Sequence, residues 1–453
     1  MMKRTSILLT LLMTVSILSA QLPLSSRRVT TADGLSGNTI NELVQDRQGY
    51  IWMATNNGLS RYDGYSTVNR REARIGRIYH DEANGLLWLS TATYQIACYD
   101  LKRARFVDWT GTGDSYRQLN KVMVTRGSMV FYGMDFGARR STYRDGQFHT
   151  TDFTKENGRL MSNRVLTVVE DSTGNLWLPT DNGITLVTPQ DECRQLEKGQ
   201  NIIAAATSRK EESGERREKR DMTYFLTASG QVLTYDSQGH KVRQTALPPQ
   251  IRRPERVNAN FMWQGQWMLF TPEGTIALDV RGSGVRGYGG TGVRDMRYEV
   301  KDGLNQGTCP GYHFIGTRTG ELWLFPDSGE ARKLQLIPNA PLSMNKGWLF
   351  HVTPDRQGRL FIATYGNGLF VYEPTTGTLS HYTANDAQPV IDSNYLTWAI
   401  TDHHGNIWVG SETTGAYCLT TEDREAVRYL LPQPDRRGGW ENSIVDVRKE
   451  FEK

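Results

Sequence analysis

The segment GYIWMATNNGL, from Gly49 to Leu59, returns twice later in the chain with modest changes. It appears again as GNLWLPTDNGI from Gly174 and as GNIWVGSETTG from Gly405. A phrase that recurs at wide, regular spacing indicates a repeated structural unit, so its period decides the fold.

Alignment on the aromatic residue of this phrase finds nine units, separated by 36 to 47 residues. Gly lies three residues before the aromatic position in seven units, and in four of these Asp lies three residues before that Gly, which gives Asp-x-x-Gly. Thr or Ser lies three residues after the aromatic position in eight units, and another Gly commonly follows, as in Thr-x-x-Gly. Each of these spacings is typical of a tight turn, in which Gly supplies a positive φ, and an apolar stretch separates the two turns. The equivalent positions are Trp52, Trp88, Phe131, Trp177, Tyr224, Met268, Phe314, Phe361 and Trp408.

Each unit therefore predicts a four-stranded antiparallel sheet. Its apolar residues do not alternate cleanly, as in YIWMAT and RLFIAT, so both faces of the sheet should be buried. Radial repetition gives every sheet a neighbour on each side. The expected fold is an all-β propeller of nine units, with the repeated aromatic residue packed between blades.

Composition excludes some classes of protein. Hydrophobic residues make up 38% and charged residues 23% of the 453-residue chain, enough for a packed core. A net charge of +4 without a basic stripe argues against nucleic acid as a partner. Cys98, Cys193, Cys309 and Cys418 match no metal motif; we expect buried small hydrophobes, with one disulfide as the alternative.

The first twenty residues predict export. Lys3 and Arg4 precede a short apolar run from 7 to 18, and Ala20 precedes a plausible cleavage point, as in a secretory signal peptide. An uncleaved membrane anchor is the alternative. No later run is long enough to span a bilayer, so the expected location is the periplasm.

The units resemble the two-component regulator propeller repeat. The first unit carries nearly the whole motif, DGLSGNTINELVQDRQGYIWMATNNGLSRYDG from Asp33 to Gly64. The fourth carries LMSNRVLTVVEDSTGNLWLPTDNGI, and the ninth carries SNYLTWAITDHHGNIWVGS; the resemblance covers about residues 25 to 420. It implies the periplasmic sensor of a Bacteroidetes hybrid two-component system, whose usual ligand is an oligosaccharide. In that plan two seven-bladed propellers precede a β-sandwich, a transmembrane helix and a histidine kinase.

The family plan implies a division of the chain. Residues 1–20 would be the signal peptide, 21–340 a first propeller of seven units, 341–425 two further blades, and 426–453 a C-terminal tail. RRVTTADGLS would lend the first ring its closing outer strand. The alternative is one larger ring of eight or nine blades. No kinase motif is present, so we expect a sensor part without enzymatic activity, truncated before the membrane helix.

Candidate ligand-binding residues lie in two classes of loop that propeller connectivity places on one face. Amides, carboxylates and aromatic rings there suit a sugar, through hydrogen bonds and stacking. Such residues also shape turns, which is the competing explanation. Irregular units two and three add Tyr94, Asp135, Arg139 and Arg140. The ligand-binding residues predicted from these loops are Asn38, Asn57, Tyr94, Asp135, Arg139, Asn163, Asp181, Asn345, Tyr365 and Asn394, with Arg140 as a neighbour of Arg139.

No catalytic residue, metal ligand or cofactor is expected. Asp46, Asp171, Asp355 and Asp402 recur in the first turn of separate units, which favours a structural role. The function expected is an extracytoplasmic sensor that binds an oligosaccharide and forms a homodimer or contacts a signalling partner in the envelope. The alternatives are a propeller glycoside hydrolase or polysaccharide lyase, and a non-functional truncated sensor.

Overall fold

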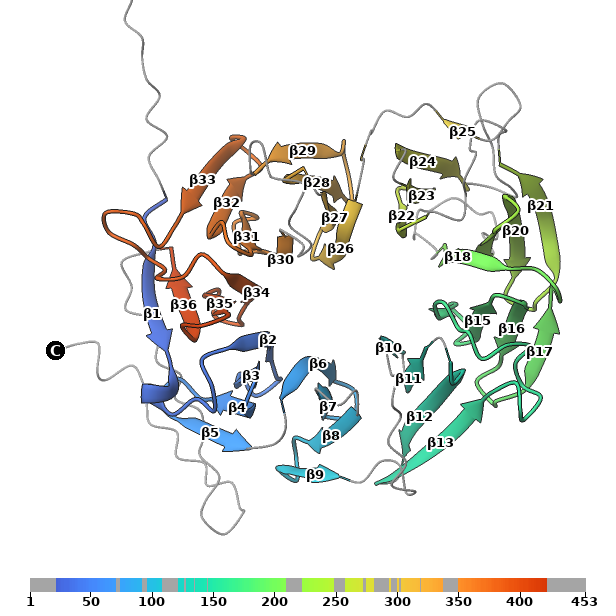
Figure 1. Ribbon diagram of the computed structural model, residues 1–453, viewed down its shortest axis with the longest axis horizontal. Coiled ribbons are helices and arrows are strands. Elements are labelled where there is room, and N and C mark those ends of the chain that lie inside the picture. The colour runs from blue at the N-terminus through green and yellow to red at the C-terminus, as the bar shows by residue number, and fades with distance from the viewer. Residues whose placement is uncertain are drawn as a thin grey trace, which may run out of the picture.

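The computed structural model describes residues 22–70, 74–91, 96–107, 121–125, 128–133, 135–144, 146–208, 222–247, 257–271, 274–280, 293–294, 300, 303–317, 319–336 and 349–421. In these residues 36 strands form nine four-stranded sheets, which stand around a common centre (Figure 1). The expected all-β propeller of nine units is confirmed. One short 3₁₀-helix, η1 (Thr31–Asp33), is the only helix that the described residues contain.

The first four blades follow one another along the chain, each running from its innermost to its outermost strand. Blade one contains β2 (Ile40–Gln45), β3 (Ile51–Thr55), β4 (Gly58–Tyr62) and β5 (Thr67–Arg70). Blade two contains β6 (Ile75–Asp81), β7 (Leu86–Thr91), β8 (Ile96–Asp100) and β9 (Arg105–Val107). Blade three contains β10 (Lys121–Val124), β11 (Met129–Tyr132), β12 (Ala138–Arg144) and β13 (Gln147–Phe153). Blade four contains β14 (Val169–Glu170), β15 (Leu176–Thr180), β16 (Gly183–Val187) and β17 (Cys193–Leu196).

The next four blades repeat this order. Blade five contains β18 (Ile202–Thr207), β19 (Met222–Thr227), β20 (Gln231–Asp236) and β21 (Lys241–Ala246). Blade six contains β22 (Ala259–Trp263), β23 (Gln266–Thr271), β24 (Gly274–Asp279) and β25 (Val293–Arg294). Blade seven contains β26 (Gly303–Cys309), β27 (Tyr312–Thr317), β28 (Glu321–Pro326) and β29 (Arg332–Gln335). Blade eight contains β30 (Leu349–Pro354), β31 (Leu360–Thr364), β32 (Leu369–Glu373) and β33 (Thr378–Tyr382).

Blade nine is built from both ends of the described chain. Three of its strands are β34 (Leu396–Thr401), β35 (Ile407–Ser411) and β36 (Ala416–Thr420). The outermost strand is β1 (Ser25–Val29), which pairs antiparallel with β36 from Ser25 opposite Thr420 to Val29 opposite Ala416. The N-terminal strand therefore closes the ring on the last blade, as Figure 1 shows in blue beside red.

This closure corrects the expected ring count. The prediction that units one to seven close on themselves is wrong, because the N-terminal outer strand pairs with unit nine instead. Blade seven continues into blade eight through a shared core that contains Leu324 and Leu360. Blade nine packs directly on blade one, with Trp408 against the cluster that holds Ile40 and Leu43. The single larger ring, which was the alternative, is the arrangement found.

The core lies between the blades. Nine clusters of buried apolar residues occur in the described residues, and each joins the inner faces of two neighbouring blades. The repeated aromatic residue supplies much of each cluster: Trp177 is fully buried and contacts Phe225 of the next blade at 5.4 Å between ring centroids. Each blade buries its two faces against the neighbouring blades, so the blades stabilise one another around the ring.

The recurring aspartates hold the first turn of their blades, as expected. Asp46 accepts the backbone N–H groups of Gln48 and Tyr50 at 2.9 and 3.0 Å, and the indole Nε1–H of Trp52 at 2.7 Å. Asp171 and Asp402 accept the corresponding Trp Nε1–H at 3.0 and 2.9 Å. These carboxylates therefore satisfy donors within their own blades.

Candidate functional site

The connections between strands define two faces of the ring. In each blade, the loop between the second and third strands lies on one face of the ring. The loop that leads into the innermost strand of the next blade lies on the same face. We call this the loop face. Asn38, Asn163 and Asn394 lie on it before the innermost strands of blades one, four and nine, and Asn57, Asp135, Asp181 and Tyr365 lie on it between second and third strands.

Three of the candidate asparagines make the same two contacts. The side-chain Oδ1 accepts a backbone N–H from the loop just before it, and the backbone carbonyl accepts an N–H from a glycine of the preceding blade. Oδ1 receives Thr31 N at 2.8 Å for Asn38, Lys155 N at 2.7 Å for Asn163, and Ala384 N at 2.8 Å for Asn394. The carbonyls receive Gly415 N, Gly137 N and Gly368 N at 2.9, 2.9 and 3.0 Å, respectively.

These contacts give the asparagines a structural role. Each side chain folds its own loop, and each carbonyl ties that loop to the neighbouring blade. Their part in ligand binding stays a prediction, and an Oδ1 that already accepts a backbone N–H has less capacity for a ligand hydroxyl. Asn57 lies in the hairpin of blade one, where its backbone N–H donates to Thr55 Oγ1 at 3.0 Å.

Tyr365 belongs to a compact aromatic cluster at the seam between blades eight and nine. Its ring meets the ring of Tyr395 edge-on, with centroids 5.0 Å apart and planes at 76°. Its hydroxyl donates to the carboxylate of Glu412, and this bond raises the pKa of Tyr365 to about 12. Tyr395 is 48% exposed, one of four large hydrophobic side chains that are exposed in the described residues. We call Tyr365, Tyr395 and Glu412 the tyrosine platform.

The backbone beneath this platform is tied down on both sides. The Tyr395 carbonyl accepts the Glu412 N–H at 3.0 Å, and the Tyr395 N–H donates to Ser393 Oγ at 3.2 Å. Asn394 accepts N–H groups from Gly366 at 2.8 Å and from Gly368. An exposed aromatic ring on a backbone held in this way loses little conformational freedom when a ligand covers it.

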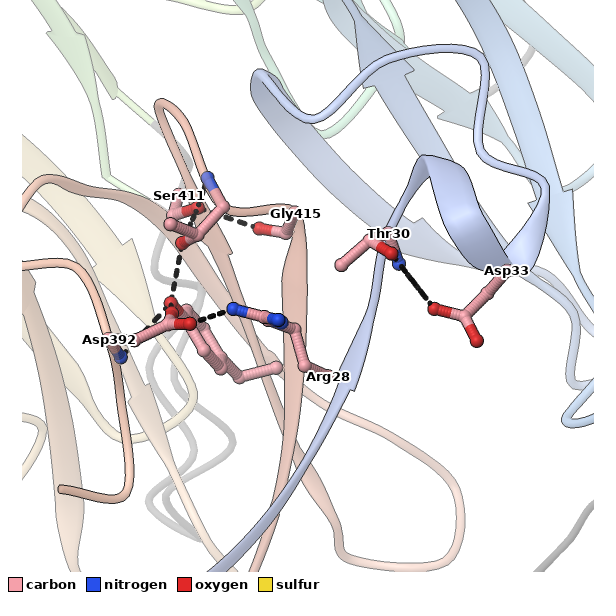
Figure 2. Close-up of polar contacts among 8 residues, drawn as sticks. Arg28, Thr30, Asp33, Asp392, Ser411 and Gly415 are labelled. Atoms are coloured by element: carbon pink, nitrogen blue, oxygen red, sulfur yellow. Dashed lines mark hydrogen bonds and ion pairs between the residues drawn. The ribbon is translucent and has the colours of Figure 1, made fainter. Parts of the chain in front are cut away.

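The ring closure lies next to the platform. Figure 2 shows Asp392, in the loop that leads to Tyr395, paired with Arg28 of the closing strand β1. Tyr417 donates its hydroxyl to Asp392 and accepts the Asp392 N–H at 3.2 Å. The network continues through Thr414 to Ser411, whose hydroxyl donates to the Gly415 carbonyl at 2.9 Å. The N-terminal strand, the loop of Asp392 and the β35–β36 hairpin are thus joined.

The closing strand also turns into blade one in this region. Thr30 donates its backbone N–H to Asp33 at 2.9 Å (Figure 2). Its Oγ1 accepts the Ala32 N–H at 3.1 Å. This capping box orders the single turn η1 between β1 and the loop of Asn38. An ordered turn therefore connects the outermost strand of blade nine to the loop before the innermost strand of blade one.

The arginines of irregular unit three are already engaged. Arg139 forms a bidentate pair with Asp152, Nε to Oδ1 at 2.5 Å and Nη2 to Oδ2 at 2.8 Å, and its side chain is only 9% exposed. Arg140 pairs with Asp191 of blade four. Both arginines therefore have interactions that a ligand would have to replace. Tyr94 and Asn345 lie outside the described residues, so the structure does not place them.

Two residues of the platform were missed by the sequence reasoning. Glu412 follows the repeated aromatic residue by four positions, as do Asn56, Asp135, Asp181 and Tyr365, so the repeat register could have identified it. Tyr395 directly follows the candidate Asn394. Its exposure depends on the packing of two blades, and no local sequence signal reports that.

A second group of side chains lies on the innermost strands. His351 of β30 stacks on Trp398 of β34, with ring centroids 4.1 Å apart and planes at 26°. From the other direction around the ring, the guanidinium of Arg77 on β6 lies over Trp398 at 5.2 Å from its centroid. Arg77 Nη1 is 3.9 Å from Glu42 Oε2 on β2. We call Glu42, Arg77, His351 and Trp398 the axial cluster.

Burial shifts both acid–base groups of the axial cluster toward neutrality. Glu42 accepts the Ile78 N–H at 2.9 Å, but burial dominates and raises the pKa of Glu42 to about 7. Burial, with a smaller contribution from the charge of Arg77, lowers the pKa of His351 to about 4. Near neutral pH, His351 is uncharged and Glu42 is ionised only in part.

The four cysteines are free thiols, so the expected alternative of a disulfide is not realised in the structure. Cys98 and Cys418 are buried as small hydrophobes, as expected, whereas Cys193 and Cys309 are half-buried. Within the described residues, no group of three or more His, Cys, Asp or Glu side chains is placed to hold a metal ion. No helix in that part of the chain has the length and apolar character needed to cross a membrane. The predicted signal peptide lies before the first described residue.

Sequence comparison identifies the repeat. Residues 34–57, which run from the lead-in loop through β3 of blade one, match the family described as the two component regulator propeller. The chain therefore carries a repeat of this family, as its motif indicated. Among curated proteins, none matches the sequence significantly.

Several solved structures are similar to this chain at low identity and low TM-score. The extracellular domain of a hybrid two-component system from B. thetaiotaomicron is 16% identical, over 86% of this chain and 52% of that one, with a TM-score of 0.35. That of a one-component system from the same organism is 17% identical, over 85% and 57%, with a TM-score of 0.32. A streptogramin B lyase is 9% identical, over 88% and 97%, with a TM-score of 0.38. The chain thus spans just over half the length of the two extracellular domains. Similarity at these identities and TM-scores carries no conclusion about function.

Proposed function

We propose that this chain is an extracytoplasmic ligand-sensing propeller that binds an oligosaccharide on its loop face and carries out no chemistry on it. The tyrosine platform is the single observation that carries the proposal. The exposed ring of Tyr395 offers an apolar face to the C–H surface of a sugar, and Glu412 and the Tyr365 hydroxyl offer hydrogen-bond partners beside it. The two-component regulator propeller repeat supports a role in signalling.

The location and the partners belong to the same proposal. The N-terminal segment has the order of a secretory signal peptide, which would place the propeller in the periplasm. A sensor must pass ligand occupancy on, and we propose a second copy of the chain or an envelope protein as the recipient. Sedimentation velocity with and without ligand tests the dimer. A chain that sediments as a monomer in both conditions would remove the second copy from the proposal.

Titration with defined glycan digests tests the binding function. Wild-type protein should give saturable heat and a rise in melting temperature, with no new reducing ends and no unsaturated sugar. Tyr395→Ala should weaken binding roughly ten-fold or more, because ring stacking is lost from a preorganised site. Tyr65→Ala is the matched control, since Tyr65 is 47% exposed in a hairpin on the opposite face of the ring.

The outcomes separate the alternatives. Release of reducing ends or unsaturated sugar would replace the sensor proposal with a hydrolase or a lyase. Binding that is equally weakened by Tyr65→Ala and Tyr395→Ala would contradict the assignment to the loop face. Absence of any saturable ligand across digests of plant, host and microbial glycans would favour the non-functional remnant.

A further inference from the structure

The exposed guanidinium of Arg77 is the least satisfied charged group in the axial cluster. Its side chain is 54% exposed although it belongs to the innermost strand of blade two. The nearest carboxylate oxygen, on Glu42, is 3.9 Å away, at the far limit of an ion pair. Stacking over Trp398 holds the planar group in place and leaves its N–H edges available.

The surroundings of Arg77 leave its positive charge incompletely balanced. Glu42 is buried and only partly ionised near neutral pH, so it does not supply a full negative charge. Tyr79 on the same strand keeps its proton, because burial raises its pKa. His351, on the other side of Trp398, is neutral. An arginine fixed on an aromatic ring with a deficit of negative charge is a recognition group for carboxylate or sulfate.

We propose that Arg77, held on Trp398, is a subsite for the carboxylate or sulfate group of an acidic saccharide whose neighbouring sugar stacks on Tyr395. The proposal rests on the binding function proposed above and specifies its substrate class. Tyr395 directly precedes the innermost strand β34, and Trp398 lies three residues further on, about 10 Å along an extended backbone at 3.3 Å per residue. A short oligosaccharide can therefore reach both positions.

The first experiment tests the anion subsite without the tyrosine platform. Full-length protein labelled at its indole nitrogens is titrated by NMR with sodium glucuronate, sodium sulfate or glucose at constant ionic strength. Trp398→Phe assigns the Trp398 indole signal. This signal should shift saturably with glucuronate and with sulfate, and it should not move with glucose.

Arginine variants identify the binding group. Arg77→Gln should weaken the anion-dependent shift about ten-fold or more, and Arg77→Lys should retain part of it, since lysine keeps the charge but loses the planar fork. Arg47→Gln is the matched control: Arg47 is 67% exposed and pairs with Glu82 in a first-to-second-strand hairpin, away from the loop face. A shift that persists in Arg77→Gln, or that also disappears in Arg47→Gln, would overturn the proposal.

The pH dependence is a second readout that a merely structural role would not produce. Between pH 8 and pH 6 Glu42 takes up its proton, while Tyr79 stays protonated and His351 stays neutral. Glucuronate affinity should therefore rise as the pH falls through about 7, and Glu42→Gln should abolish this dependence. A wild-type affinity that is independent of pH over this range would contradict the charge balance on which the subsite rests.

A final arm separates this inference from the proposed function. A uronic-acid oligosaccharide is compared with its carboxyl-reduced form on wild type, Tyr395→Ala and Arg77→Gln. We expect Tyr395→Ala to weaken both ligands and Arg77→Gln to weaken only the acidic one. If Arg77→Gln alone fails to weaken binding of the acidic ligand, the anion subsite is contradicted. If Tyr395→Ala alone fails to weaken binding, the tyrosine platform is contradicted.

Discussion

Replacing Glu42 with Gln should stabilise the propeller at alkaline pH and leave its stability at acid pH nearly unchanged. Glu42 is 6% exposed, and its side chain accepts one backbone N–H, a contact that the amide oxygen of Gln can also make. Gln has nearly the same shape but no proton to lose. The substitution therefore isolates the cost of ionising a carboxyl group at the blade one–blade two interface.

The magnitude follows from the pKa of Glu42, which burial raises from 4.5 to about 7. At about 1.4 kcal/mol for each pH unit, this corresponds to about 3 kcal/mol. Because the pKa is raised in the folded state, the folded protein holds this proton over a pH range in which the unfolded chain has lost it. The Glu42 contribution to stability is complete below about pH 4.5 and is lost as the pH rises to about 7 and beyond.

The assay is urea unfolding followed by tryptophan fluorescence at pH 5, 6.5 and 8. Glu42→Gln should exceed wild type by about 3 kcal/mol at pH 8 and by much less at pH 5. Glu82→Gln is the control: Glu82 lies exposed in a surface pair with Arg47, so its replacement should give no gain that grows with pH. An advantage of equal size at pH 5 and pH 8 would refute the reasoning, as would a wild type that is more stable at pH 8.

Three further predictions concern packing and closure. His351→Phe keeps a ring on Trp398 but removes a group whose pKa burial lowers from 6.5 to about 4. As the pH drops from 6.5 to 4, the free energy of unfolding of wild type in urea should fall by up to about 3 kcal/mol, and that of the variant should not. Parallel pH profiles would contradict this. Gly368→Ala should lower stability by about 2 kcal/mol or more in thermal melts, because φ is +74° and the new Cβ would lie 2.2 Å from a carbonyl oxygen of β33. Gly358→Ala is the control and should cost less, because Gly358 has a φ of +81° but open space around the new Cβ. Equal losses would show that the steric clash is not the cause. Val29→Ala removes buried methyl groups from the closing strand and should cost about 1–3 kcal/mol of stability, against at most about 1 kcal/mol for Arg28→Ala, whose ion pair is half-exposed. Proteolysis of β1 should accordingly be faster in Val29→Ala than in Arg28→Ala. The reverse order would assign closure of the ring to the ion pair.

The repeat by itself determined the blade. Asp46 and its equivalents, the Gly that ends most first turns and the buried aromatic residue were read from spacing alone, because turn chemistry and strand length are local properties. The structural use of the recurring aspartates followed from the same local reasoning. These features need no knowledge of what lies across the ring.

Tertiary structure decided how many blades make a ring and where exposed groups meet. The outer strand Ser25–Val29 pairs with β36, 395 residues away at Ser25 and Thr420. No repeat pattern specifies such a long-range pairing. The same closure brings blades eight and nine together at Tyr365 and Tyr395, and brings blades nine and two together at Trp398 and Arg77. A periodic sequence specifies each blade and its apolar faces. The number of blades that closes the ring depends on the angle at which neighbouring blades pack, and this angle is set only when the side chains of both blades are in place.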